Sequence, residues 1–226
     1  MSSLASSRDS HAQGSVYGSL GQELEAWAAT GLIAKLWWRD DDAVTDTAQL
    51  RRLLEVARDV QAVVAVAVVP EHADCSLVHV LSGNPCCVWQ HGWGHKFHKS
   101  GEFGDGRTLD TMADDAVAGA RALDSLFGPV GWQKVFVPPN HKLSLAFKAL
   151  IPKLGYLGLS AGAPLTPPIK GVTEFNAEID VMNWPEGKIL EGSAIEENFC
   201  GAATGASVGV ASARPANRNF DASSRL

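Results

Sequence analysis

The sequence contains no long apolar run and no cluster of basic residues. Its longest uninterrupted apolar stretch, residues 62–69, has eight residues, whereas a membrane-spanning helix needs about 20. The formal charge at pH 7 is −6, and the absence of a basic run argues against a nucleic-acid surface. We therefore expect a protein that neither spans a membrane nor binds nucleic acid.

Cysteine is scarce as well. The four cysteines, at positions 75, 86, 87 and 200, are too few and too irregularly spaced for a disulfide framework. The adjacent Cys86 and Cys87 lie in an apolar run, as is typical of small core residues. The first 20 residues lack the apolar segment of a secretory signal peptide. These features predict a cytoplasmic protein in which residues 1–20 are disordered.

Apolar strands alternate with amphipathic helices along the middle of the chain. Residues 62–69 are too continuously apolar for a strand that faces water, which indicates a parallel sheet. Residues 109–128 have the clearest amphipathic helix pattern. Further strands are predicted at residues 32–38, 86–90, 134–139, 156–161 and 175–184, and further helices at residues 22–29, 47–58, 71–82 and 143–154. This order is typical of an α/β domain with a parallel sheet or barrel, here over residues 21–200.

The C-terminal segment differs in composition from the rest of the chain. Residues 201–226 are rich in Ala, Gly and Ser, and their large apolar side chains are Val208, Val210, Phe220 and Leu226. Ordering the backbone costs about 1–2 kcal/mol per residue. Burying a large apolar side chain returns only about 1.5–3 kcal/mol. We therefore expect a disordered or poorly packed tail that contributes little to stability.

Polar side chains follow three of the predicted strands. The aspartates at residues 40–42 follow one strand, His91 and His95 follow another, and a turn at Pro139 and Asn140 follows a third. The carboxyl ends of parallel strands meet at one edge of a sheet or barrel. We therefore expect these groups to converge on one face.

Three adjacent carboxylates repel one another, so a cation among them is the simplest reason for the aspartate run. His91 and His95 are four positions apart, a spacing that lets one turn of chain direct both imidazoles at one ion. With one aspartate they would form a two-histidine, one-carboxylate site that leaves positions for water, as catalytic metal sites do. A second aspartate could then take a proton from that water. His98, one helical turn further on, is more typical of an exposed histidine.

The order of strand–Asp-Asp, strand–HxxxH and strand–Pro-Pro turn resembles the polysaccharide deacetylase family, the NodB-homology domains of carbohydrate esterases. The resemblance covers residues 25–185. It implies an α/β fold, namely a distorted, incomplete (β/α) barrel, and a divalent metal, most commonly Zn²⁺. The activity it implies is the hydrolytic removal of acetyl groups from N-acetylated carbohydrates.

The family motifs also imply roles for individual residues. In the first motif Asp41 resembles the general base and Asp42 a metal ligand, although the shifted register, Asp40 and Asp41, stays open. The second motif makes His91 and His95 the other ligands. The third implies that Pro139 and Asn140 contact the substrate, with Asn140 or His141 close to the bound acetyl group and a backbone N–H of that turn stabilising the oxyanion.

Two family features are missing from this chain. Val137 stands near the position where the third motif has an arginine, and no histidine follows His141, although the family takes its general acid from a late histidine. Glu178 and Asp180 are the acidic residues that the late segment offers instead.

The resemblance therefore implies a metal-dependent deacetylase that cleaves carbon–nitrogen bonds, possessing most but not all of the family's catalytic groups. A non-carbohydrate amide is also compatible with this machinery. The alternative is a non-catalytic metal- or carbohydrate-binding protein on the same scaffold. The sequence gives no indication of the oligomeric state.

Overall fold

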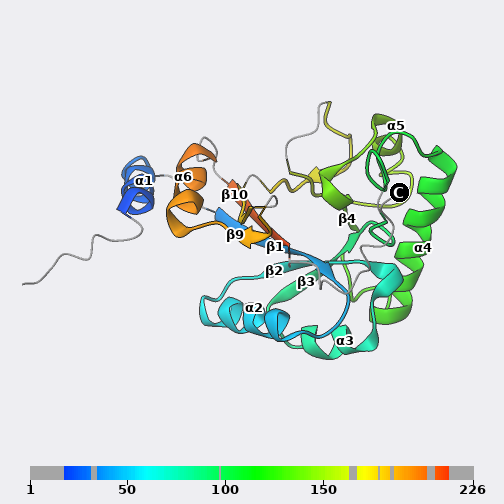
Figure 1. The fold of residues 1–226 in the computed structure, drawn as a ribbon, viewed down its shortest axis with the longest axis horizontal. Coiled ribbons are helices and arrows are strands. Elements are labelled where there is room, and N and C mark those ends of the chain that lie inside the picture. Colours follow the sequence, from blue (N-terminus) through cyan, green and yellow to red (C-terminus); the bar gives the residue numbers. More distant parts are fainter. Residues whose placement is uncertain are drawn as a thin grey trace, which may run out of the picture.

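One curled parallel sheet forms the centre of the fold, and helices cover its outer face (Figure 1). The computed structural model describes residues 18–31, 35–96, 98–162, 167–177, 179–183, 186–202 and 207–213, and within these ranges the sheet has eight strands. Their order is β6-β5-β4-β3-β2-β1-β10-β7, and every neighbouring pair is parallel. The parallel sheet predicted from the alternation of strands and helices is therefore confirmed.

The elements alternate along the chain until residue 159. The strands of the sheet are β1 Lys35–Ala43, β2 Val64–Val68, β3 Cys86–His91, β4 Val135–Val137, β5 Gly158–Leu159, β6 Thr173–Glu174, β7 Ile179–Asp180 and β10 Ser207–Ala213. The α-helices are α1 Gly18–Ala29, α2 Ala48–Asp59, α3 Cys75–Leu81, α4 Leu109–Phe127, α5 Leu145–Lys148 and α6 Gly192–Ala202. Short 3-10 helices lie at η1 Pro70–His72 and η2 Pro139–His141, and β8 Met182–Asn183 pairs antiparallel with β9 Lys188–Ile189.

The two faces of the sheet carry different side chains because successive residues of a strand point to opposite faces. The outer face packs against helices: Val64, Val66 and Val68 of β2 share a core with buried residues of α2, α3 and α4. The inner face of the same strand carries Ala65 and Ala67, which pack with residues of β3 and β4 in a separate cluster. Small residues here make room for the indole rings of Trp37 and Trp89 inside the curled sheet.

A short segment of sequence joins the two edges of the sheet. Strands β6 and β7 are the edge strands, yet only residues 175–178 separate them in sequence. The segment pairs with β5 at its beginning and with β10 at its end, and Ala177 N–H donates to Ala161 O at 2.8 Å. Because both edges belong to one short stretch of chain, the sheet must curl towards a barrel.

The predicted helices begin where the sequence offers a cap. The side chains of Thr47 and Thr108 each accept a backbone N–H of the first turn, in α2 and α4 respectively. The buried face of α4 consists of Met112, Ala116, Gly119 and Leu123, as its amphipathic pattern predicts. Among the described residues, no helix is both long and apolar enough to cross a membrane.

Several predicted elements differ in extent from the observed ones. Strand β1 continues to Ala43, so the aspartates lie within the strand rather than after it. The helix predicted at residues 143–154 is limited to α5, a single turn. The strand predicted at residues 175–184 is divided into β7 and β8, which belong to different sheets. Strand pairing and tertiary packing, which the local sequence pattern does not contain, set these boundaries.

The prediction of a disordered tail is wrong for residues 207–213. They form β10, which pairs with β1 over seven residue pairs, from Lys35–Ser207 to Asp41–Ala213, and also pairs with β7. Strand β10 lies between two other strands, and backbone hydrogen bonds on both of its sides offset the lack of large side chains. Residues 203–206 and 214–226 lie outside the described residues, as do residues 1–17 of the N-terminal segment, whereas residues 18–20 belong to α1.

Candidate metal centre

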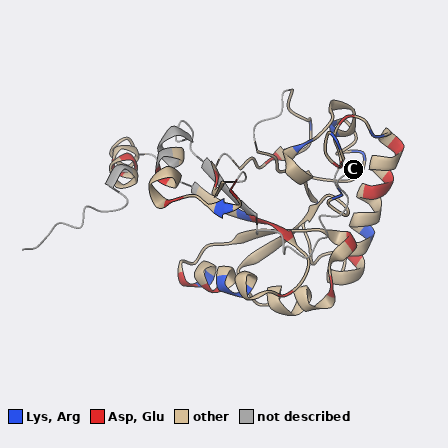
Figure 2. Ribbon diagram, viewed as in Figure 1, with Lys and Arg blue, Asp and Glu red and all other residues tan. Residues whose placement is uncertain are grey.

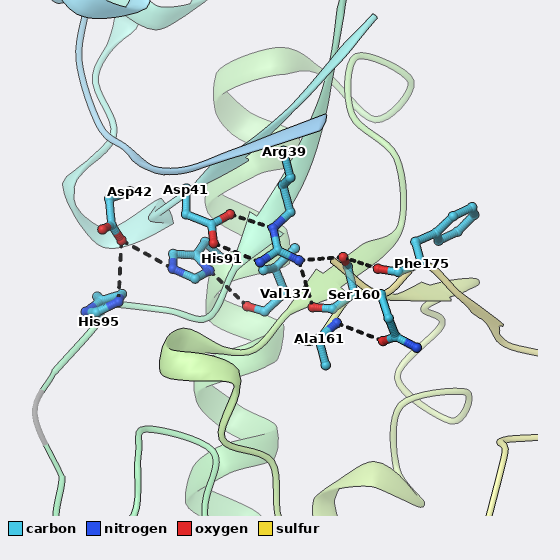
Figure 3. Close-up of polar contacts among 10 residues, drawn as sticks. Arg39, Asp41, Asp42, His91, His95, Val137, Ser160, Ala161 and Phe175 are labelled. Atoms are coloured by element: carbon cyan, nitrogen blue, oxygen red, sulfur yellow. Dashed lines mark hydrogen bonds and ion pairs between the residues drawn. The ribbon is translucent and has the colours of Figure 1, made fainter. Parts of the chain in front are cut away.

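Asp42, His91 and His95 converge at the carboxyl end of the sheet. Oδ1 of Asp42 lies 3.2 Å from Nε2 of His91 and 3.4 Å from Nε2 of His95. One potential ligand atom from each residue lies within 4.8 Å of the others. Both imidazoles point towards the Asp42 carboxylate (Figure 3). The structure therefore brings together the residues that the sequence predicts as metal ligands.

A local distortion of β1 directs Asp42 towards the histidines. The pairing of β1 with β2 shifts in register between Asp40 and Ala43, and Asp42 has a φ of 66°. Left-handed backbone at an aspartate is uncommon and re-aims its side chain relative to a regular strand. In Figure 2 the end of β1, coloured red for its aspartates, lies near the centre of the fold. Because of this bulge, the side chain of Asp42 does not follow the alternating directions of a regular strand that Asp40 and Asp41 follow.

His91 is held in one orientation by its strand and by β4. It is the last residue of β3 and only 3% exposed, and its Nδ1 lies 3.1 Å from the carbonyl oxygen of Val137. Because a carbonyl only accepts, Nδ1 carries a proton, so in the neutral ring Nε2 is the nitrogen with the free lone pair. This is the tautomer that a metal-ligating histidine needs.

The site carries more negative than positive charge. Burial lowers the pKa of His91, but the hydrogen bond to Asp42 and the charges of Asp41 and Asp42 outweigh burial and raise this pKa above its ordinary value. The protein therefore favours a positive charge at this point. A divalent ion would supply that charge instead of a proton.

Asp41 is held by Arg39, a residue that sequence reasoning missed. The two side chains form a bidentate pair, with Nε–Oδ1 at 2.7 Å and Nη2–Oδ2 at 2.9 Å. Arg39 is fully buried, and its Nη1 donates to Oγ of Ser160 at 2.5 Å, as Figure 3 shows. Ser160 Oγ in turn donates to the carbonyl of Phe175. Residues 39 and 41 share a face of β1, and this alternation was the signal that could have revealed the pair.

Asp40 faces away from this centre. It is paired in register with Val66, whose side chain belongs to the outer core under the helices. The geometry therefore favours Asp41 and Asp42, and not Asp40 and Asp41, as the aspartates of the site.

The turn after β4 lies beside the Arg39–Asp41 pair. Pro139 is buried, and Asn140 and His141 both adopt left-handed φ values, 53° and 58°. Burial, and then the positive charge of Arg39, lowers the pKa of His141. The Nδ1 atom of His141 is buried, without a hydrogen-bond partner among the described residues. Two consecutive non-glycine residues in this conformation store strain, a feature that concentrates at functional sites.

The other candidate residues lie outside this group of ligands. His98 is half-buried and does not belong to the cluster. Asp180 accepts the backbone N–H of Met182 at 2.9 Å, and Glu178 lies outside the described residues. Trp93, between the two histidines, packs against the outer core.

Solved structures share this architecture, although no protein-family model matches the sequence and no curated protein sequence matches it. A family 4 carbohydrate esterase from Streptomyces lividans, in complex with acetate, is 16% identical and has a TM-score of 0.56, with 81% of this chain and 80% of that chain covered. The chain has the fold of the family 4 carbohydrate esterases. The distorted, incomplete (β/α) barrel implied by the sequence resemblance is thereby confirmed.

Two further structures show what this fold accommodates. A family 4 acetyl xylan esterase from Clostridium thermocellum, in complex with a cobalt ion, is 13% identical over 81% of this chain and 74% of that chain, with a TM-score of 0.55. A family 4 pseudoenzyme from Bacillus anthracis is 10% identical over 79% of this chain and 54% of that chain, also with a TM-score of 0.55. The fold therefore occurs in hydrolases and in a pseudoenzyme.

Proposed function

We propose that the protein is a metal-dependent hydrolase that removes acetyl groups from N-acetylated carbohydrates. The observation that carries this proposal is the convergence of Asp42, His91 and His95 next to a buried Arg39–Asp41 pair. Three ligands on one side and an oriented carboxylate beside them are the parts that metal-assisted amide hydrolysis requires. The acetate and acetyl xylan in the names of the similar structures support acetylated carbohydrate as the substrate class.

The donor set fits a divalent ion such as Zn²⁺. Two ligand atoms that each lie about 2.1 Å from a tetrahedral ion are about 3.4 Å apart. The distances from Asp42 to His91 and His95, 3.2 and 3.4 Å, agree with this spacing. Two imidazoles and one carboxylate leave positions for water and substrate. An ion held here would lower the pKa of water and polarise the acetyl carbonyl.

Each protein side chain then has a defined task. Asp41 takes the proton of the attacking water, and Arg39 fixes the direction of its carboxylate through two hydrogen bonds. The Val137 carbonyl keeps Nε2 of His91 as the ligating nitrogen. The Pro139–Asn140 turn contacts the acetyl group and offers a backbone N–H to the oxyanion.

His141 is our candidate for contact with the departing amine. It is the last histidine of the chain, and its buried Nδ1 has no partner among the described residues. Its lowered pKa favours a neutral imidazole at pH 7, and a neutral imidazole can donate a hydrogen bond to the substrate or accept one from it.

The second candidate function is metal or carbohydrate binding without turnover. It is favoured by the missing late histidine and by the pseudoenzyme among the similar structures. The metal centre and the fold are the same in both candidates, so only an activity measurement separates them. A cytoplasmic location stays a prediction from the sequence.

An assay of acetate release separates the two candidates. Protein loaded with Zn²⁺ or Co²⁺ is incubated with N-acetylated chito-oligosaccharides, acetylated xylan and aryl acetates, and Asp41→Asn serves as the reference. Hydrolysis above that variant, with equal metal content in both proteins, supports the enzyme. Acetate release by the metal-loaded wild-type protein that is no greater than that of its metal-free form would overturn the enzyme in favour of binding alone.

A further inference from the structure

The chain between His91 and His95 follows neither a helix nor a strand. Residues 92–95 lie outside regular elements, and Gly92 and His95 have φ values of 57° and 53°. A helical HxxxH motif would fix both imidazoles through its own backbone hydrogen bonds. This loop cannot do so, and another part of the protein must hold it.

Glu102 supplies that support. Its carboxylate accepts the backbone N–H of Trp93 at 3.2 Å through Oε2 and that of Gly94 at 2.9 Å through Oε1. Glu102 is only 1% exposed, so water does not compete for these hydrogen bonds. One side chain thus binds both central N–H groups of the loop that carries the two histidines.

Backbone groups of neighbouring elements complete the support of the loop. Gly92 N–H donates to Val137 O at 3.1 Å, and the Glu71 backbone N–H donates to Trp93 O at 3.0 Å. Nε2 of Gln90 donates to Gly92 O at 2.9 Å. The other contacts to the loop come from backbone groups and the Gln90 amide, whereas Glu102 contacts it through a carboxylate.

The charge of Glu102 is buried, and backbone groups rather than a cation bind it. Among the described residues its carboxylate forms no ion pair, and Arg107 donates to its backbone carbonyl instead. A buried carboxylate is costly unless hydrogen bonds or a nearby positive charge stabilise it. Two backbone N–H groups supply part of that stabilisation.

We propose that Glu102 is a positioning residue for the metal centre: it holds the 92–95 loop so that His95 faces Asp42. This inference rests on the proposed metal site. The expected consequence of replacing Glu102 is a loss of metal affinity without a loss of any ligand. Residues that orient metal ligands typically contribute about 10–100-fold to metal affinity.

Gly92 gives an independent way to displace Glu102. A Cβ atom at this position would lie 2.4 Å from Oε2 of Glu102 and 2.6 Å from Cγ of Pro139. Gly92→Ala would therefore displace the Glu102 carboxylate, the flexible end of its side chain, together with the Pro139 ring, so it tests the support of the loop as a whole. Gly83 is the matched control, since it has a left-handed φ of 71° but its surroundings hold no atom within 4 Å of an added Cβ.

The test is a Co²⁺ titration of purified full-length protein, followed by visible absorption and calorimetry, with the thermal midpoint of each metal-free protein measured in parallel. Glu102→Gln keeps the length of the side chain but turns an NH₂ group towards one of the two N–H donors. We expect Glu102→Gln and Gly92→Ala to bind Co²⁺ about 10–100-fold more weakly, with an altered absorption spectrum. Gly83→Ala and the exposed-site control Glu55→Gln should match the wild type in both.

The results of the titration test both the positioning role of Glu102 and the proposed metal site. Wild-type affinity and spectrum in Glu102→Gln would overturn the positioning role, even if the thermal midpoint falls. If Glu102→Gln does not fold, Gly92→Ala decides by the same criterion, and wild-type affinity there refutes the inference. Absence of Co²⁺ binding by the wild-type protein would refute the proposed metal site itself.

Discussion

Replacing Arg39 by methionine tests whether the buried pair with Asp41 is essential to the site. Methionine has an unbranched side chain that can replace the aliphatic part of Arg39, but it lacks the guanidinium. Arg39 is 0% and Asp41 6% exposed, so the variant leaves a carboxylate buried without its cation. Breaking a buried pair in this way costs about 3–5 kcal/mol.

The expected change is large enough for a simple thermal scan. For a domain of this size, 1 kcal/mol shifts the midpoint by about 2–4 °C, so Arg39→Met should lower it by about 6–20 °C. Arg52→Met is the matched control: Arg52 forms a surface pair with Glu55 at 3.2 Å, and its side chain is 70% exposed. A surface pair contributes about 0–1 kcal/mol, which corresponds to at most about 4 °C.

A double variant separates the cost of an unpaired charge from the cost of lost packing. Arg39→Met combined with Asp41→Leu removes both charges, and it should be more stable than Arg39→Met alone. Circular dichroism of the metal-free proteins measures all four midpoints. If Arg39→Met shifts the midpoint no more than Arg52→Met does, the pair is not buried as described, and Asp41 is not oriented by it.

Three further sets of variants test the site and the sheet. His91→Ala and His95→Ala should each lose stoichiometric metal, whereas His98→Ala should retain it; metal analysis after dialysis would contradict the ligand set if His98→Ala is the one that loses the ion. Asp41→Asn should keep its metal but lose acetate release by on the order of a hundredfold, as expected for a general base; an unchanged rate would exclude that role. Deletion of residues 207–226 removes β10 from between β1 and β7, and at about 1 kcal/mol per backbone hydrogen bond it should cost several kcal/mol; a midpoint within about 2 °C of the wild type would show that the strand adds nothing.

Much of the fold and of the ligand set could be predicted because both depend on patterns along the chain. The alternation of apolar strands and amphipathic helices determines a parallel sheet. The position of Asp42, His91 and His95 at the ends of two strands then determines their convergence. The bulge that aims Asp42 leaves no such pattern, since it depends on how β1 pairs with β2.

Arg39 and Glu102 were missed for different physical reasons. The family resemblance predicts an arginine in the third motif, near Val137, whereas in this chain β1 supplies one two residues before Asp41. The strand period of two contained this information. Glu102 is separated from His95 by a loop, and only the folded backbone brings its carboxylate to Trp93 and Gly94. No spacing rule could have identified it.

Strand β10 was missed because composition predicts whether a segment is folded only from the side chains of that segment. Its stability comes from the strands on either side, β1 and β7, which pair with it through the backbone. An argument from large apolar residues cannot detect such a contribution.

X-ray absorption spectroscopy of the Zn²⁺-loaded protein tests the metal centre on which this account depends. We predict one ion per chain with two imidazole ligands at about 2.0–2.1 Å and the remaining ligands oxygen. In His95→Ala, which does not retain the ion on dialysis and is therefore measured at saturating Zn²⁺, the bound ion should have one imidazole fewer. A spectrum without imidazole scattering, or one that His95→Ala leaves unchanged, would contradict a site built from Asp42, His91 and His95.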